Sequence, residues 1–232
     1  MSIIRFTLIG IWSAFAITLS AVVALVTFSP KLSVAMARWF WSPVILFFAG
    51  AKVKMVNHNS VLNALNPSIV VANHSSFLDI PILFNTVPFN VHFVAKKELK
   101  KMPFVGWYMM LTRMIFIDRS NRSKSYESLR KAGQLIRKGK SVITFPEGSR
   151  SEDSSIAMFK QGTFQLALEA QVPIVPVRIQ GAGRVWPTKG FKLFPGEVNV
   201  IFGEPIFPEY YKNLKAKELA KYVQGKVEGL VE

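Results

Sequence analysis

Residues 68–80 read SIVVANHSSFLDI, and residues 141–150 read SVITFPEGSR. Each stretch begins with a short run rich in β-branched residues and continues at once into polar and charged residues. Such a run predicts a buried strand, and the polar residues that follow predict a turn at its end. Because open α/β sheets bind ligands at the carboxyl ends of their strands, the two turns together predict one binding site.

The chain after residue 50 alternates between strand-like and helix-like segments, without an internal repeat or a long linker. Strands are predicted at residues 68–72, 91–95, 114–117, 141–145, 173–179 and 197–202. Helices are predicted at residues 76–86, 104–112, 123–138, 160–170 and 214–230. This alternation predicts an α/β sandwich around a mixed, largely parallel sheet, with residues 51–232 forming one domain.

The first 50 residues have a different composition. Residues 6–28 are 23 consecutive residues without a charge, and a helix of that length spans about 34 Å, close to the hydrocarbon thickness of a bilayer. A second apolar stretch, residues 34–50, is rich in Trp and Phe but is interrupted by Arg38 and Pro43, which is typical of the headgroup boundary. We therefore predict an N-terminal membrane-anchoring helical segment at residues 1–50.

This anchor has two alternative forms, one spanning helix with an interfacial helix beside it, or a two-helix hairpin within one leaflet. A cleaved signal peptide is a further alternative, but Lys31 and Arg38 do not resemble a small-residue cleavage site. Because basic residues follow the anchor, the positive-inside rule places the domain on the cytoplasmic face of the cell inner (plasma) membrane.

The composition limits the chemistry. The chain carries 29 Lys and Arg against 14 Asp and Glu, a net charge of +15, which suits an anionic membrane surface or an acidic substrate. Nucleic acid is the competing partner. However, Trp12, Trp39 and Trp41 lie in the anchor and do not alternate with basic residues, so no nucleic-acid partner is predicted. The chain has no cysteine, which excludes disulfides, thiolate metal sites and a Cys nucleophile.

The first turn contains a histidine and a carboxylate. Only three histidines exist, and His74 is the one that follows a strand next to an acidic residue, Asp79. Neutral imidazole can serve as a general base, and a carboxylate on its other ring nitrogen fixes the tautomer. This requires His74 in the turn and Asp79 in the first turn of the next helix. The alternative is that Ser76 and Asp79 form a helix-capping pattern and that His74 is an ordinary turn residue.

The second turn combines an acid, a glycine and a base. Arg150 can bind a phosphate in a bidentate manner, and Gly148 can present a backbone N–H to an oxyanion. Glu147 can accept a hydrogen bond from a substrate hydroxyl or hold Arg150 in place. The alternative is a polar turn with an internal Glu147–Arg150 ion pair.

Four blocks of the sequence, in order, resemble the motifs of the glycerolipid acyltransferase family, in particular the 1-acyl-sn-glycerol-3-phosphate acyltransferases. The family's motifs read NHxxxxD, a Lys-rich entry that ends in IDR, FPEG(S/T)R and a VPIVPV-like run. They are matched here by Asn73, His74 and Asp79, by Lys96 and Ile117–Arg119, by residues 145–150 and by residues 172–177.

The resemblance implies an acyltransferase domain at residues 51–232. It implies transfer of a fatty acyl chain from acyl-CoA or acyl-ACP to the free hydroxyl of 1-acyl-sn-glycerol 3-phosphate (lysophosphatidic acid), giving phosphatidic acid in phospholipid biosynthesis. The partners would be membrane lipid, lysophosphatidic acid and acyl-CoA or acyl carrier protein, with no metal ion and no cofactor beyond the acyl donor. His74 and Asp79 would be catalytic. The substrate-binding residues would be Lys96, Arg119, Glu147, Gly148, Ser149 and Arg150.

One departure from the family pattern precedes the IDR strand. Members often have a glycine there, where this chain reads Leu111-Thr112-Arg113. This leaves two further acyltransferase alternatives open, which act on a lyso-ornithine lipid or on another lysophospholipid. An esterase that uses the same His–Asp pair with water, and a non-catalytic membrane-tethered module that binds anionic lipid, are alternatives of a different class.

Overall fold

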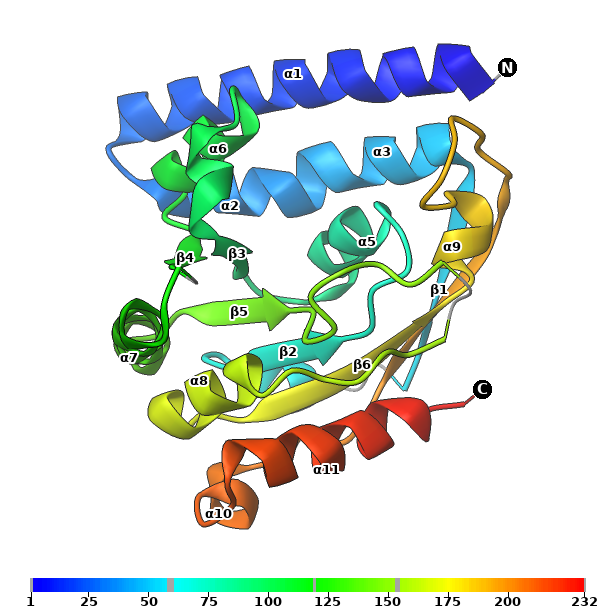
Figure 1. The fold of residues 1–232 in the computed structure, drawn as a ribbon. Helices are drawn as coiled ribbons and strands as arrows, with labels where there is room; N and C mark the ends of the chain where they lie inside the picture. Colours follow the sequence, from blue (N-terminus) through cyan, green and yellow to red (C-terminus); the bar gives the residue numbers. More distant parts are fainter. Residues whose placement is uncertain (1, 58–60, 119, 153–154, 232) are drawn as a thin grey trace.

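The structure is a computed structural model that describes residues 2–57, 61–118, 120–152 and 155–231 (Figure 1). The described residues form a seven-stranded sheet with the order β1-β7-β6-β2-β5-β3-β4. The pair β6–β7 is antiparallel, and every other neighbouring pair is parallel. The strands are β1 Ala51–Val56, β2 Ile69–Ala72, β3 Val91–Lys96, β4 Ile115–Ile117, β5 Ser141–Thr144, β6 Ile174–Gln180 and β7 Gly196–Phe202.

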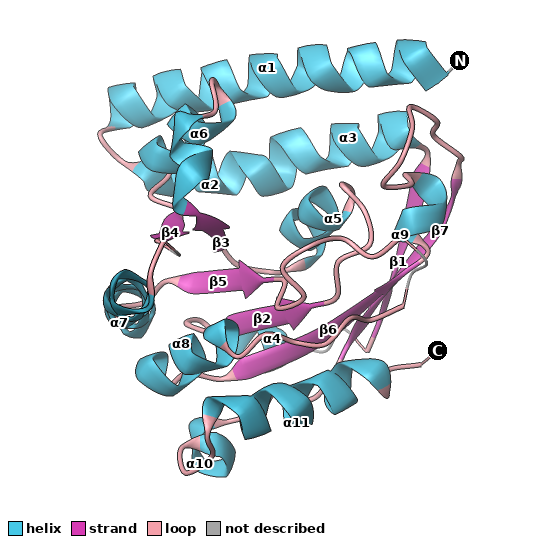
Figure 2. Ribbon diagram, viewed as in Figure 1, coloured by secondary structure: helices cyan, strands magenta, loops and turns pink. Residues whose placement is uncertain are grey.

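Helices cover both faces of the sheet, so the predicted α/β sandwich is confirmed (Figure 2). The six predicted strands are present with ends shifted by one residue, whereas β1 was not predicted. Its lysines, Lys52 and Lys54, are exposed on an edge strand, and this mixture of charge and partial burial gives no buried-strand signal. The helices of the domain are α4 Val61–Ala64, α5 Asp79–Thr86, η2 Lys97–Lys101, α6 Val105–Leu111, α7 Arg122–Arg137, α8 Gly162–Ala170, α9 Ala182–Val185, α10 Pro208–Tyr211 and α11 Ala216–Glu228.

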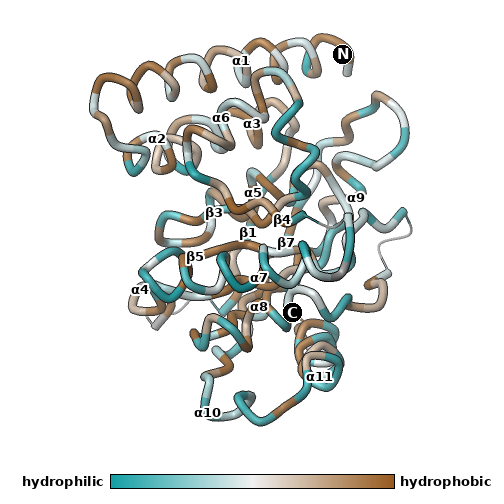
Figure 3. Tube along the Cα trace, turned by 60° about the vertical axis from the view of Figure 1, so that its left-hand side comes forward, coloured by the Kyte–Doolittle hydropathy of each residue, from teal (hydrophilic) through white to brown (hydrophobic). Residues whose placement is uncertain are grey.

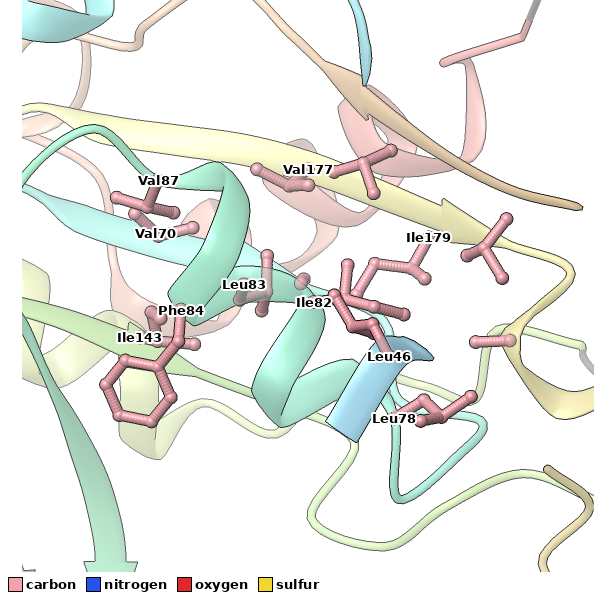
Figure 4. Packing of buried hydrophobic residues seen from close by; sticks show 14 of the residues in the cluster. Leu46, Val70, Leu78, Ile82, Leu83, Phe84, Val87, Ile143, Val177 and Ile179 are labelled. Carbon is pink, nitrogen blue, oxygen red and sulfur yellow. The ribbon is translucent and has the colours of Figure 1, made fainter. Parts of the chain in front are cut away.

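The central strands are buried on both faces, which explains their continuous apolar runs. Along β2, Val70 and Ala72 point into one core cluster, and Ile69 and Val71 point into the other. The first cluster lies under α5 and the N-terminal helices, and Figure 4 shows Leu46 of helix α3 (Ser42–Ala49) close to the side chains of α5. The second cluster lies between the sheet and helices α7, α8 and α11.

The N-terminal segment forms a hairpin of two long helical arms. α1 (Ser2–Thr27) turns at Ser29 into a second arm, made of α2 (Pro30–Met36), a π-helical turn η1 (Ala37–Trp41) and α3 (Ser42–Ala49). A hydrogen bond of 3.0 Å from Trp41 Nε1 to Ser13 Oγ joins the arms. Both arms are long and apolar enough to cross a membrane by length and composition.

The hairpin lies along the domain and does not project from it. Figure 1 shows the two arms running antiparallel above α5, and Figure 3 shows that α1 is largely hydrophobic along its length. Ile9, Ile45 and Leu46 of the hairpin belong to the same buried cluster as the sheet residue Val70. Residues before and after position 50 therefore share one hydrophobic core. The division of the chain at residue 50 into an anchor and a domain stays a prediction.

The side chain of Asn73, the first residue of the NHxxxxD motif, joins the end of β2 to β6. Its side chain is 5% exposed, and its Oδ1 accepts a hydrogen bond of 2.7 Å from the Ile179 N–H. Its Nδ2 donates a bond of 2.9 Å to the Ile179 carbonyl. The backbone register of β2 and β6 ends at Ala72 and Val177, so the amide of Asn73 continues the pairing beyond it.

We predict that Asn73→Ala destabilises the fold by about 2–4 kcal/mol, because the buried N–H and C=O of Ile179 lose their partners. Chemical unfolding of the detergent-solubilised protein measures this difference. The matched control is Asn213→Ala at an exposed turn, which we expect to change stability by no more than about 0.5 kcal/mol. Equal losses of stability in the two variants would contradict the role of the Asn73 side chain in joining β2 and β6.

Candidate active site

The two polar turns meet at one edge of the sheet, as the sequence predicted. β2, β5, β3 and β4 are neighbouring parallel strands, so their carboxyl ends point the same way. His74 follows β2, the FPEGSR turn (residues 145–150) follows β5, and Lys96 ends β3. A backbone hydrogen bond of 2.9 Å from the Ser151 N–H to the His74 carbonyl joins the two turns directly.

His74 and Asp79 are in contact. His74 Nδ1 lies 2.7 Å from Asp79 Oδ2, and the Asp79 side chain is fully buried. The same oxygen accepts the backbone N–H groups of Ser75 and Ser76 at 2.7 and 2.9 Å. A carboxylate acceptor on Nδ1 places the imidazole proton there and leaves the lone pair of Nε2 for a substrate. The His74 ring is 16% exposed and stacks on Phe145, with the ring centroids 4.1 Å apart.

The capping alternative is met in part, since Asp79 Oδ2 accepts the Ser76 N–H, but the same oxygen also contacts the His74 ring. α5 begins at Asp79 itself, with Leu78 as its N-cap residue, so Ser76 lies before the helix. Ser76 Oγ accepts the Leu78 N–H at 3.1 Å and donates to the Trp186 carbonyl at 2.7 Å. The predicted helix at residues 76–86 therefore starts three residues late, and that short turn brings His74 and Asp79 together.

The Glu147 carboxylate is buried and accepts hydrogen bonds from backbone N–H groups. Its side chain is 2% exposed, and its Oε1 accepts the His74 N–H at 2.6 Å while its Oε2 accepts the Ala157 N–H at 2.9 Å. Burial raises the pKa of this carboxyl group. The ion pairs of the described residues do not include Glu147 and Arg150, so the expected pair between them is corrected. The expectation that Glu147 binds a substrate hydroxyl stays a prediction.

Arg150 and Gly148 have different surroundings in the turn. The Arg150 guanidinium stacks over the Phe77 ring, 3.5 Å from its centroid, and burial lowers its pKa while Asp79 opposes that effect. Gly148 has φ +78°, and its N–H donates a hydrogen bond of 3.1 Å to the Phe145 carbonyl. The turn itself uses this N–H, and the expectation that Gly148 serves an oxyanion stays a prediction.

The other predicted site residues differ in position. Lys96 is exposed and lines the apolar cavity described below, and Ser149 is exposed on the FPEGSR turn. Arg119 lies outside the described residues, as does His58. Asp118, which directly precedes Arg119 in the sequence, accepts a hydrogen bond of 2.9 Å from Lys97 Nζ, and this bond lowers the pKa of Asp118.

Two further residues lie away from the site. Arg113 precedes the amino end of β4, whereas the site lies at the carboxyl ends, and its carbonyl accepts a hydrogen bond from Lys140 Nζ. His92 lies within β3, where burial and the charge of Lys140 lower its pKa to about 4. His74 is thus the histidine of the described residues that faces the site.

An apolar cavity of about 550 Å³ opens beside His74. That volume lies in the range of roughly 300–1,000 Å³ that is typical of ligand pockets. His74, Gly148 and Lys96 border the cavity, and apolar side chains form most of its wall. The wall includes Ile9, Ala37, Trp41, Phe84, Phe93 and Met109. These residues come from α1, η1, α5, β3 and α6, so no single stretch of sequence predicted the cavity.

Comparison with known proteins identifies the family. The sequence model described as Acyltransferase matches residues 52–180. The chain belongs to this acyltransferase family. A relative from Saccharomyces cerevisiae, named 1-acyl-sn-glycerol-3-phosphate acyltransferase, is 36% identical over 194 residues, which are 82% of this chain and 63% of the relative. A relative of the same enzyme name from Chlamydomonas reinhardtii is 36% identical over 159 residues, 68% of this chain and 47% of the relative.

The fold agrees with a solved member of this group. The crystal structure of the 1-acyl-sn-glycerophosphate (LPA) acyltransferase PlsC from Thermotoga maritima matches with a TM-score of 0.76 at 28% identity. The match covers 99% of this chain and 96% of that one. By contrast, the chain spans less than two thirds of the length of the two curated relatives, at 63% and 47%.

We predict that Glu147→Gln lowers the free energy of unfolding by about 1–3 kcal/mol, since a glutamine can accept only one of the two amide N–H groups. The Tm of a protein of this size should fall by about 2–4 °C for each kcal/mol. Thermal unfolding measures the change. The control is Glu152→Gln, because Glu152 pairs with Lys189 on the exposed surface and its substitution should leave the Tm unchanged. A Tm equal to that of the wild type in Glu147→Gln would contradict the role of this carboxylate as a link between the turns.

Proposed function

We propose that this protein transfers an acyl chain from an acyl thioester to the free hydroxyl of lysophosphatidic acid, giving phosphatidic acid. One observation carries the proposal, namely that the His74–Asp79 pair borders an apolar cavity at the carboxyl ends of the strands. The names of the relatives from Saccharomyces cerevisiae and Thermotoga maritima support the choice of acceptor.

His74 acts as the general base in this proposal. Its Nε2 takes the proton of the acceptor hydroxyl while the oxygen attacks the thioester carbonyl carbon. The tetrahedral intermediate then collapses, the C–S bond breaks, and the proton on the imidazolium passes to the leaving thiolate. Asp79 holds the ring and stabilises the imidazolium, because its carboxylate lies 2.7 Å from Nδ1.

No covalent acyl-enzyme is required by this reaction. The chain has no cysteine, and Ser149 lies in the sequence EGSR, which lacks the G-x-S-x-G pattern of a nucleophile elbow. Acyl donor and acceptor therefore bind together, and we expect sequential kinetics. The donor can be acyl-CoA or acyl carrier protein, both of which are anionic partners for a chain with a net charge of +15.

The apolar cavity holds the acyl chain of the thioester, and the cations at the strand ends hold the phosphate of the acceptor. Lys96 borders the cavity, and Arg150 lies near the buried charge of Asp79. The position of Arg113 at the far end of β4 supports lysophosphatidic acid over another lysolipid, because this departure from the family pattern does not reach the site.

Membrane attachment through the N-terminal hairpin gives the site access to amphiphilic substrates. The two arms lie side by side along the domain, which favours insertion into one leaflet over a single spanning helix. Large apolar side chains of α1 are exposed to the surroundings, among them Ile3, Ile4, Ile11, Phe15, Leu25 and Val26. The basic charge of the chain favours the cytoplasmic face of the cell inner membrane.

We predict that His74→Ala reduces turnover by about 100- to 10,000-fold, because the attack then lacks a general base. Purified protein is incubated with lysophosphatidic acid and either oleoyl-CoA or oleoyl-ACP, and phosphatidic acid is measured by mass spectrometry. The matched control is His92→Gln, which removes a histidine from β3 and should leave turnover close to that of the wild type.

Two results would contradict the proposed function. Activity close to the wild-type level in His74→Ala would exclude His74 as the base. Release of free fatty acid without phosphatidic acid would identify the protein as an esterase that uses the same His–Asp pair with water.

A further inference from the structure

We propose that Lys160 binds the phosphate of the acceptor lipid and is a specificity-determining residue of the site; this inference rests on the proposed function. Lys160 matches none of the motif positions considered above. The sequence placed it in a helix at residues 160–170, but α8 begins at Gly162. Lys160 therefore belongs to the segment between β5 and α8, which loops past the ends of β5 and β2 (Figure 1).

The backbone and the side chain of Lys160 both contact the FPEGSR turn. The Lys160 N–H donates a hydrogen bond of 2.9 Å to the Pro146 carbonyl. A Cβ added at position 148 would lie 2.6 Å from Lys160 Nζ and 3.3 Å from its Cδ. The space that a side chain at position 148 would fill is therefore occupied by the ammonium group of Lys160.

A short chain of contacts connects this ammonium group to the catalytic histidine. Gly148 is hydrogen-bonded to Phe145, and the Phe145 ring stacks on the His74 ring. Phe145 and Gly148 also border a second cavity of about 280 Å³, and Lys160 and Thr163 lie in its wall. Phe145 and Gly148 line both cavities, so the smaller cavity, which has a cation beside it, adjoins the apolar cavity at this turn.

The charge of Lys160 lacks an internal partner in the part of the chain that the structure describes. None of the ion pairs there includes Lys160, and the nearby carboxylate of Glu147 is bonded to the amides of His74 and Ala157. Lys160 is exposed, so it can meet an anion from outside the protein. A compact ammonium group with three donors suits a phosphate.

The covalent structure of the substrates decides which phosphate this is. In lysophosphatidic acid only a few covalent bonds separate the reacting hydroxyl from the phosphate, so a hydroxyl at His74 Nε2 keeps the phosphate close to the FPEGSR turn. The phosphates of coenzyme A and of acyl carrier protein are separated from the thioester by the long pantetheine arm. Arg150 belongs to the FPEGSR turn and the Lys160 ammonium lies beside Gly148 of the same turn, so this turn offers two cations to a dianion.

The kinetic test compares Lys160→Ala with the wild type in the phosphatidic acid assay. We expect the KM for lysophosphatidic acid to rise by about tenfold or more, with kcat and the KM for oleoyl-CoA nearly unchanged, because binding shared by ground and transition states is lost. Lys160→Arg keeps the charge and should restore much of the affinity. Lys212→Ala, an exposed lysine on the turn after α10, is the matched control and should leave every constant unchanged.

A binding test separates this inference from the proposed function. The inactive His74→Ala protein, with and without Lys160→Ala, is titrated with glycerol 3-phosphate by calorimetry, and we expect the second substitution to weaken binding by a similar factor. An unchanged KM for lysophosphatidic acid, an effect on the KM for oleoyl-CoA alone, or unchanged binding of glycerol 3-phosphate would each overturn the role of Lys160. A wild-type protein that makes no phosphatidic acid would instead overturn the proposed function.

Discussion

The buried carboxylate of Asp79 is the constraint on which the site depends. An ionised carboxylate without partners is costly in the protein interior, so the chain around it must supply donors. Here Asp79 Oδ2 accepts hydrogen bonds from the imidazole of His74 and from the backbone N–H groups of Ser75 and Ser76. The turn therefore folds around Asp79 Oδ2, and the bond to this oxygen sets the orientation of the His74 ring.

A second buried carboxylate fixes the backbone of the same histidine. Glu147 accepts the His74 N–H, and Asn73 bonds to both backbone groups of Ile179 in β6. His74 is thus held through its ring by one turn and through its backbone by another. The polar residues of both motifs mostly hold one another in place, so that the imidazole needs little rearrangement when a substrate binds.

The sequence alone predicted the features that depend on residues close together in the chain. Residues 69–72 and 141–144 are buried on both faces, so each gives an apolar run that can be read without knowledge of the fold. The His74–Asp79 pair was predictable because it requires only that a helix begin within a few residues of a strand. By contrast, β1 is an edge strand whose exposed lysines, Lys52 and Lys54, hide its pairing with β7.

Other features depend on contacts between distant segments and could not be predicted in this way. The use of the Gly148 N–H by its own turn follows from a backbone angle, and the place of Lys160 follows from where the chain enters α8. The apolar cavity also depends on contacts between distant segments, because residues of the predicted anchor form part of its wall. Trp41 borders the cavity and also donates a hydrogen bond to Ser13 of α1. Residues of the hairpin form part of the wall beside His74, so the segment that was predicted as a membrane anchor also shapes the site. Under the proposed membrane attachment, the position of the hairpin would therefore set the position of the cavity relative to the lipid headgroups.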